Sequence, residues 1–252
     1  MVSTGCTSRR GSTAGMSIRN LSSDAGPPIS RGPFGWSRHR RPILADVRTG
    51  ILGGTFDPIH LAHLHAGETA LSQKQLDRVL FMPAGDPWQK TDRVLTPADQ
   101  RLEMVRLAVA DVEGFEADDR EIERDGPTYT IDTLLSFPPD EELFVIVGAD
   151  AALGIPTWHR WEAILQRAGI LVVPRLGTDL SLVAGSVPTA VMLEMAALDV
   201  SSTMIRAMAA EGRPYRFLVP AEVHGYIETT GLYTQSGSGD RVGVANEQEE
   251  SP

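Results

Sequence analysis

Short apolar segments alternate with amphipathic segments between residues 49 and 212. The apolar segments, which we predict to be strands, are 49–54, 78–84, 142–150, 169–174 and 189–195. The segments that we predict to be helices are 61–73, 97–110, 128–137, 161–168 and 202–212, the second of them with Thr96 as its N-cap. Strands that are apolar almost throughout are typical of a parallel sheet with helices on both faces. The sequence therefore predicts an α/β fold, a Rossmann-like doubly wound parallel sheet, with ligand-binding residues at the carboxyl ends of its strands.

The predicted domain spans residues 49–234 and is flanked by two polar segments. Residues 1–48 are rich in Ser, Arg, Gly and Pro and have no apolar periodicity, so we predict that they are disordered. Their composition resembles that of a transit peptide, but they lack a clear amphipathic helix. The scarcity of Lys and the abundance of Arg, Ala and Gly favour an over-extended start in a GC-rich bacterial gene instead. Residues 235–252 have the composition of a linker and are predicted to be unfolded.

Charge and cysteine content exclude several functional classes. The net charge is −10, and because residues 1–49 hold eight Arg and two acids while residues 235–252 hold four acids and one Arg, the residues between them carry −13. A body this acidic repels a phosphate backbone, so we expect no broad nucleic-acid binding. We expect no membrane insertion either, because no apolar stretch reaches the roughly 20 residues that span a bilayer. Cys6 is the only cysteine, which excludes an intrachain disulfide and suits a cytoplasmic protein.

An H-x-x-H pattern follows the first predicted strand, in the segment GILGGTFDPIHLAHLHAGETAL. His60 and His63 lie three residues apart at the start of the next predicted helix, so their side chains share a face over its first turn. Unpaired backbone N–H groups attract anions there. The adjacent Gly53 and Gly54 let a ligand approach the backbone. Together these features predict a phosphate or oxyanion site.

The same segment fits other known patterns less well. The glycine pair lacks the third glycine of a dinucleotide fingerprint, and the chain has no G-x-x-x-x-G-K-[ST] loop. Helix capping by one histidine, with the others solvated, stays open as an alternative. Zinc is a second alternative, although His65 points off the face that His60 and His63 share, and a third protein ligand is missing. We expect no chemical role for His65.

Two motifs resemble those of the nucleotidylyltransferase superfamily. GGTFDPIHLAH is similar to its signature G-x-[ST]-F-[DN]-P-x-[HT]-x-G-H, with Ala62 in place of the usual glycine. VSSTMIR is similar to its S-S-T-x-I-R element, which supplies triphosphate-binding hydroxyls and an arginine. The resemblance implies that ATP contacts residues of both motifs, namely Gly53, Gly54, Thr55, Phe56, His60, His63, Ser201, Ser202, Thr203 and Arg206. Taken alone, the Ser-Ser-Thr run would only cap a helix, but Arg206 follows on the same helical face as a forked phosphate donor.

Within the superfamily, the chain is most similar to the bacterial nicotinate-nucleotide adenylyltransferase family, from about Gly50 to Tyr233. The resemblance rests on three further elements, EIERDGPTYTIDTL, GADAALGIPTWHRW and MPAGDPWQKTDRVLTPADQRLEM. In the last element, Trp88 and Gln89 precede Lys90 where many relatives have a Pro-Pro-His-Lys loop. Lys90 is a candidate ATP ligand, with a solvated loop lysine as the alternative.

The resemblance implies adenylyl transfer from ATP to nicotinate mononucleotide, which gives nicotinate adenine dinucleotide and pyrophosphate in NAD biosynthesis. The attacking phosphate monoester has a second pKa of about 6, so it is mostly a dianion at neutral pH and needs no general base. Catalysis then consists of aligning two anions and stabilising the leaving pyrophosphate, and we assign these roles to His60, His63 and Arg206. Mg²⁺, held mainly by the ATP phosphates, would reduce their mutual repulsion, and no metal ligands on the protein are expected.

One group of residues is predicted to bind the nicotinate half. The predicted helix opens at Thr128 and leaves the amides of Tyr129 and Thr130 for a carboxylate, which would favour the acid nucleotide over the amide. The resemblance implies that Trp158 stacks on the pyridine ring. Trp161, which shares a predicted helical face with Trp158, is assigned to the core.

Strand ends supply the remaining candidates. Asp150 ends a predicted strand and would accept a hydrogen bond from a ribose hydroxyl, and Arg175 follows another strand as a candidate phosphate ligand. Asp57 is expected to brace the Phe-Asp-Pro turn.

Two rival functions stay open. Phosphopantetheine adenylyltransferases share both outer motifs, but they typically have Thr at the position of His60 and lack the Thr-Tyr-Thr block. A non-catalytic nucleotide sensor on the same fold is the rival from another class, since a fold does not determine a function. The presence of His60, His63 and Arg206 argues against a sensor. A homo-oligomer is also left open.

Overall fold

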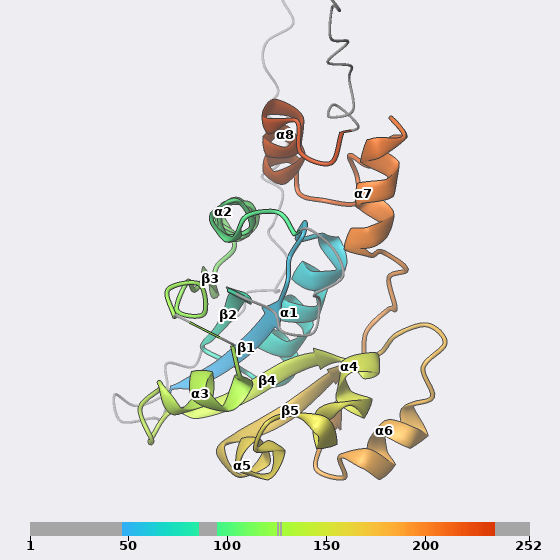
Figure 1. Cartoon of the computed structure of the whole chain (residues 1–252). Helices are drawn as coiled ribbons and strands as arrows, with labels where there is room; N and C mark the ends of the chain where they lie inside the picture. Colours follow the sequence, from blue (N-terminus) through green and yellow to red (C-terminus); the bar gives the residue numbers. More distant parts are fainter. Residues whose placement is uncertain (1–46, 86–94, 125, 127, 235–252) are drawn as a thin grey trace, which may run out of the picture. The chain divides into compact units, whose positions relative to one another are not determined.

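A six-stranded parallel sheet runs through the described residues, 47–85, 95–124, 126 and 128–234, of the computed structural model (Figure 1). Its strands are β1 (Arg48–Gly54), β2 (Arg78–Pro83), β3 (Phe115–Ala117), β4 (Glu142–Gly148), β5 (Ala168–Val173) and β6 (Val191–Met192). Their order across the sheet is β3-β2-β1-β4-β5-β6. The chain thus places β2 and β3 on one side of β1, and then crosses to the other side of β1 for β4, β5 and β6. This arrangement confirms the predicted doubly wound α/β fold.

Helices cover both faces of the sheet, because alternate side chains of each strand point to opposite faces. The helices are α1 (Leu61–Gln73), α2 (Ala98–Val109), α3 (Thr130–Leu135), α4 (Ala149–Leu153), α5 (Trp161–Arg167), α6 (Leu180–Ser186), α7 (Ser202–Ala210) and α8 (Ala221–Thr230), with a 3₁₀ turn, η1 (Ile155–Thr157). Leu52 and Phe81 pack in the core beneath α1, α2, α7 and α8. Ile51 and Leu80, their neighbours along the strands, pack with α3, α4, α5 and α6. The two cores explain why the inner strands are apolar throughout.

Several predicted boundaries were wrong. The helix expected over 97–110 begins at Ala98, and its N-cap is Pro97 rather than Thr96. The strand expected over 142–150 ends at Gly148, where α4 starts. The segment 189–195 contributes only two residues of strand, because only Leu171 and Val172 of β5 pair with it. The helix expected over 128–137 is α3, which starts two residues later than predicted and is shorter.

Some elements were missing from the prediction, and some predicted segments lie outside the described residues. Sequence reasoning did not identify β3, α6 or α8. The predicted disordered tails, 1–48 and 235–252, lie outside the described residues except for 47 and 48, so their disorder stays a prediction. Lys90, with Trp88 and Gln89, also lies outside the described residues.

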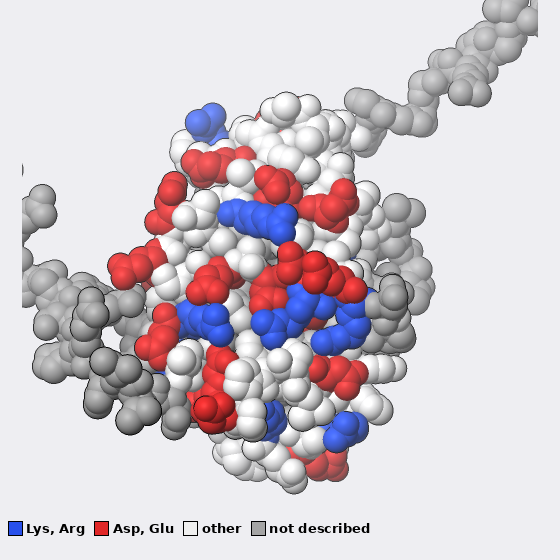
Figure 2. Space-filling model, turned by 90° about the vertical axis from the view of Figure 1, so that its left-hand side faces the viewer, with Lys and Arg blue, Asp and Glu red and all other residues white. Residues whose placement is uncertain are grey.

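Basic and acidic side chains are interspersed on the surface. On the face shown in Figure 2, the Lys and Arg side chains lie among Asp and Glu side chains. Arg106 of α2 pairs with Asp119 at 3.0 Å, and Arg120 pairs with Asp118 at 2.7 Å. The described part of this face therefore presents no continuous basic patch of the kind that binds a nucleic-acid backbone.

Candidate active site

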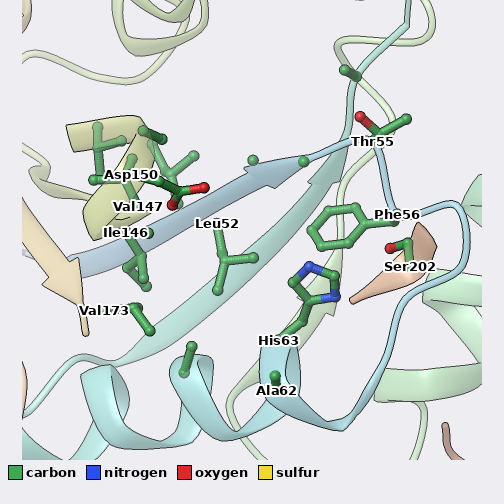
Figure 3. Close-up of a pocket in the computed structure, with 18 of the residues that line it drawn as sticks. Leu52, Thr55, Phe56, Ala62, His63, Ile146, Val147, Asp150, Val173 and Ser202 are labelled. Carbon is green, nitrogen blue, oxygen red and sulfur yellow. The ribbon is translucent and has the colours of Figure 1, made fainter. Parts of the chain in front are cut away.

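A cavity of about 740 Å³ opens at the carboxyl ends of β1 and β4, the two central strands. The chain winds to opposite sides of the sheet at this point, and open α/β sheets bind their ligands in such a crevice. Apolar side chains line part of it, including Leu52, Ile146, Val147 and Val173, which are drawn in Figure 3. Polar groups from separate loops and helix starts surround this apolar wall.

Two glycines at the end of β1 shape the edge of the cavity. A Cβ on Gly53 would meet no protein atom within 4 Å, although the residue lines the cavity. The space beside Gly53 is therefore open to a ligand. A Cβ on Gly54 would stand 3.2 Å from the ring of Phe56, which is buried and adopts a left-handed backbone with φ of 48°. Gly54 thus lets the chain turn tightly and tuck the Phe56 ring under the loop.

His60 and His63 lie at the start of α1 with their rings stacked, 3.7 Å between centroids. The backbone N–H of His60 donates to Nδ1 of His63 at 3.2 Å, so the ring proton of a neutral His63 sits on Nε2. His63 points into the cavity, with its ring edge-to-face on Phe56 at 5.0 Å (Figure 3). His63 therefore makes a capping contact with the helix start, and this contact orients its imidazole. The other half of the capping alternative, solvated neighbouring histidines, does not hold for His60, which is buried.

His60 is 2 % exposed, and its Nδ1 is buried with no hydrogen-bond partner. Burial, with a smaller contribution from the positive charge of Arg175, lowers the pKa of His60 from 6.5 to about 4. His60 is therefore neutral at physiological pH. An unpartnered buried ring nitrogen is costly in a folded protein, which makes it a candidate for contact with a ligand.

The start of α7 is tied directly to the turn after β1. Ser201 caps α7, because its Oγ accepts from the backbone N–H of Met204 at 3.2 Å. Ser202 Oγ donates to the carbonyl of Pro58 at 2.9 Å. Arg206 donates from Nη1 to the carbonyl of Asp57 at 2.6 Å and from Nη2 to Thr203 Oγ1 at 3.1 Å. The two sequence motifs, 144 residues apart at Pro58 and Ser202, therefore meet in one cleft.

Asp57 braces this turn, as the sequence predicted. The Asp57 carboxylate is buried and accepts a hydrogen bond from Tyr233 Oη at 2.7 Å. Burial and the neighbouring Asp57 charge raise the pKa of Tyr233, so the phenol stays a donor. The last described residues of the chain thus help to fix the first motif.

Asp150 and Arg175 face each other above Gly148, at the ends of β4 and β5. Their Oδ1 and Nε atoms are 3.6 Å apart, and both side chains are largely exposed. A Cβ on Gly148 would stand 2.6 Å from Asp150 Oδ1, so the glycine permits this arrangement. Contrary to prediction, Asp150 lies in the first turn of α4 rather than at the end of a strand. Its carboxylate still borders the cavity (Figure 3).

The predicted nicotinate-binding residues line the cavity, and α3, which follows them, packs on the other face of the sheet from α7. Their local structure differs from the prediction. Tyr129 is the N-cap of α3, so the first helical amides are those of Thr130 and Ile131 rather than Tyr129 and Thr130. Thr128 Oγ1 is buried and has no hydrogen-bond partner. Like His60 Nδ1, it belongs to a residue that lines the cavity, and these are the two such buried side-chain atoms in the described part of the chain.

Trp158 and Trp161 do not share a helix. Trp158 follows η1 in an extended conformation, and Arg160, with φ of 54°, turns the chain before α5 begins at Trp161. Trp158 lines the cavity, and both indoles pack on the core beside α5. The prediction of a common helical face was wrong because a left-handed residue between the two tryptophans has no reliable sequence signal when it is an arginine.

Three polar cavity residues were missed by sequence reasoning: Glu121, Thr133 and His159. Glu121 is 8 % exposed and accepts from Thr133 Oγ1 at 2.7 Å, while burial raises the pKa of its carboxyl. The His159 ring lies 4.6 Å from that of Tyr129. The available signal was that Glu121 and Thr133 lie in the same segment as the Thr-Tyr-Thr run, EIERDGPTYTIDTL, and that His159 follows Trp158.

Neither a metal cluster nor a membrane span is found in the described residues. No three His, Cys, Asp or Glu side chains gather there in a way that could hold a metal ion. No helix among them is both long and apolar enough to cross a bilayer.

Comparison with known proteins places this site in a family. Residues 51–208 match the cytidylyltransferase-like family. A protein from Dehalococcoides mccartyi named "Probable nicotinate-nucleotide adenylyltransferase" is 39 % identical over 201 residues, which cover 75 % of this chain and 98 % of the relative. A protein of the same name from Acidothermus cellulolyticus is 42 % identical over 202 residues, 77 % of this chain and 97 % of the relative.

A solved structure shares the fold at lower sequence identity. The nicotinic acid mononucleotide adenylyltransferase of Plasmodium falciparum, solved in complex with NaAD, superposes with a TM-score of 0.62 at 18 % identity, over 74 % of this chain and 97 % of that one. Because the bacterial relatives match over nearly their whole length, the chain belongs to the cytidylyltransferase-like family and, within it, to the nicotinate-nucleotide adenylyltransferases.

Proposed function

We propose that this protein transfers the adenylyl group of ATP to nicotinate mononucleotide. A phosphate oxygen of the mononucleotide attacks the α-phosphorus of ATP, and the bond from that phosphorus to the bridging oxygen breaks. The bond electrons leave with pyrophosphate, and the product is nicotinate adenine dinucleotide. The names of the bacterial relatives and the ligand of the Plasmodium structure support this choice of substrates.

The observation that carries the proposal is the junction of the two motifs. Ser202 and Arg206 donate to the carbonyls of Pro58 and Asp57, which lie two and three residues before His60. Hydroxyl, guanidinium and imidazole donors therefore surround one end of a single cavity. Such a set of fixed donors suits a polyphosphate whose leaving group gains charge during the reaction.

We assign the phosphates of ATP to this end of the cavity. Neutral His60 would act as a hydrogen-bond donor, His63 would donate from Nε2, and Arg206 would supply the positive charge. Gly53, Gly54, Thr55 and Phe56 would contact ATP from the turn after β1, and Ser201, Ser202 and Thr203 from the start of α7. Asp150 would do so from the first turn of α4 and Arg175 from the segment after β5. Lys90, which lies outside the described residues, stays a candidate ATP ligand through the family resemblance. None of these groups needs to exchange a proton, because the attacking phosphate is already a dianion at neutral pH.

Nicotinate mononucleotide is assigned to the end lined by Thr128, Tyr129, Thr130 and Trp158. The unpartnered hydroxyl of Thr128 and the first amides of α3 offer donors for the pyridine carboxylate. A carboxamide carries no charge and would gain less from the same groups. The acid nucleotide is therefore the preferred substrate of this arrangement.

The ATP substrate is the MgATP complex. We assign the ion to the ATP phosphates, whose oxygens are the ligands that Mg²⁺ prefers. When bound, the ion would neutralise part of the phosphate charge and so reduce the repulsion between the two nucleotides.

Pyrophosphate release from MgATP and nicotinate mononucleotide tests the proposal. We expect turnover by the wild type and a roughly 100-fold lower kcat for His63→Ala, the loss typical of one transition-state donor. His65→Ala is the matched control, because His65 lies half a turn further along α1 and does not line the cavity. ATP binding without pyrophosphate release would favour a nucleotide sensor, and turnover only with phosphopantetheine would favour the sister enzyme.

A further inference from the structure

Arg101 of α2 is the largest fully buried side chain of the described residues, at 1 % exposure, yet it does not line the cavity. A buried guanidinium needs compensation for the water it has lost. The compensation comes here from backbone carbonyls. Arg101 donates from Nη1 to Thr55 at 2.8 Å, from Nη2 to Ala84 at 2.7 Å and to Gly85 at 3.2 Å, and from Nε to Thr96 at 3.0 Å.

These acceptors come from different walls of the site. Thr55 begins the turn after β1, the wall to which we assign the ATP phosphates, and Ala84 follows β2. Both residues line the cavity. The fork of Arg101 therefore links the ends of two adjacent strands from behind the cavity wall. A planar guanidinium with five donors suits this task, because it holds its acceptors at fixed relative positions.

The residue after Ala84, Gly85, contacts residues at the nicotinate end of the cavity. A Cβ on Gly85 would stand 2.2 Å from the carbonyl oxygen of Glu121, so the two backbones touch. Glu121 in turn accepts from Thr133 of α3, which follows the predicted nicotinate-binding residues. A continuous path of contacts thus runs from the Thr55 turn through Arg101, Gly85 and Glu121 to Thr133 in α3.

We infer that Arg101 is a positioning residue that fixes the ATP-binding wall and the nicotinate-binding wall relative to each other. The inference rests on the proposed function and deepens it. In-line transfer requires the two substrates to be aligned, and a misplacement of about 1 Å can cost about 100-fold in rate. Arg101 touches neither substrate, so its loss should disturb the alignment more than the binding of either nucleotide alone.

The experiment compares Arg101→Lys with Arg106→Lys. Lysine keeps the positive charge but replaces the planar fork with a single ammonium group. Arg106 lies on the same helix, is half exposed and pairs with Asp119, so it controls for an arginine-to-lysine change in α2. For Arg101→Lys we expect kcat to fall about 10- to 100-fold while the Kd of MgATP, measured calorimetrically without the second substrate, changes less than about threefold. Arg106→Lys should match the wild type.

Gly85→Ala provides a second, independent perturbation of the same path. It leaves Arg101 intact but forces the Gly85 and Glu121 backbones apart, and it should reproduce the loss of kcat with retained MgATP affinity. If Arg101→Lys fails to fold, the kcat of Gly85→Ala is the test of the inference. Wild-type kcat in Arg101→Lys, or in Gly85→Ala where Arg101→Lys does not fold, would overturn the inference. So would a kcat loss that only follows the folded fraction or the MgATP affinity. If the wild type itself forms no dinucleotide, the proposed function fails, which is a separate result.

Discussion

The buried imidazole of His60 should make the stability of the protein depend on pH in a calculable way. Its pKa is about 4 in the folded protein, mainly because of burial, against 6.5 for an ordinary histidine. As the pH falls below about 6.5, the unfolded chain takes up a proton that the folded protein resists. The contribution of His60 to the free energy of unfolding is therefore fully present above pH 6.5. It is lost progressively as the pH falls to the pKa of the folded protein.

The size of the effect follows from the two pKa values. One pKa unit corresponds to about 1.4 kcal/mol, so complete passage through both values costs about 3 kcal/mol. Between about pH 7.5 and about pH 5, the linkage relation gives a loss of about 2 kcal/mol from this residue. Other titrating groups contribute as well, so the test must compare two proteins that share them.

His60→Asn isolates the contribution of His60. Asn does not titrate in this range and is a favoured N-cap residue, so α1 should still form. Urea unfolding at both pH values gives four free energies of unfolding. We expect the wild type to lose about 2 kcal/mol more than His60→Asn on going from pH 7.5 to pH 5. His65→Asn, which removes a more exposed imidazole from the same helix, is the control. A difference below about 0.5 kcal/mol, or one of opposite sign, would refute the assignment of a buried neutral His60.

Three further predictions concern packing, charge placement and specificity. Gly67→Ala should lower the free energy of unfolding, measured in urea, by about 1 kcal/mol, because a Cβ there would stand 2.7 Å from the buried ring of Phe81. Gly225→Ala in α8 is the contrasting variant: its Cβ would meet nothing within 4 Å, so it should raise the free energy of unfolding by about 0.5 kcal/mol. Arg206→Lys should lower kcat/KM about 10- to 100-fold in the pyrophosphate assay, because an ammonium cannot keep the contact with the Asp57 carbonyl and also offer a forked donor; unchanged kinetics would remove Arg206 from the site. The ratio of kcat/KM for the acid nucleotide to that for the amide should exceed about 10, and a ratio near one would contradict a carboxylate site at α3.

The chain order of the fold and the location of the site could be predicted from the sequence, because both depend on local patterns. Continuous apolar runs such as 169–174 indicate strands that are buried on both faces, and the structure has β5 there. The first motif follows the first strand, and in a parallel sheet the carboxyl ends of strands share one edge. The pairing of the two motifs in one cleft could be inferred only through their resemblance to a superfamily, since nothing local in the sequence brings Ser202 to Pro58.

The tertiary structure decided the features that depend on contacts between distant segments. The position of Arg160 in the left-handed region separates Trp158 from Trp161, although their spacing alone predicts a shared helical face. The neutral state of His60 results from burial, which a sequence does not display. The set of hydrogen bonds that Arg101 donates is another such feature, because its acceptors are backbone carbonyls and every residue has one. A pattern of side chains can therefore locate a site along the chain, whereas the protonation and alignment of its groups depend on which buried atoms the fold brings together.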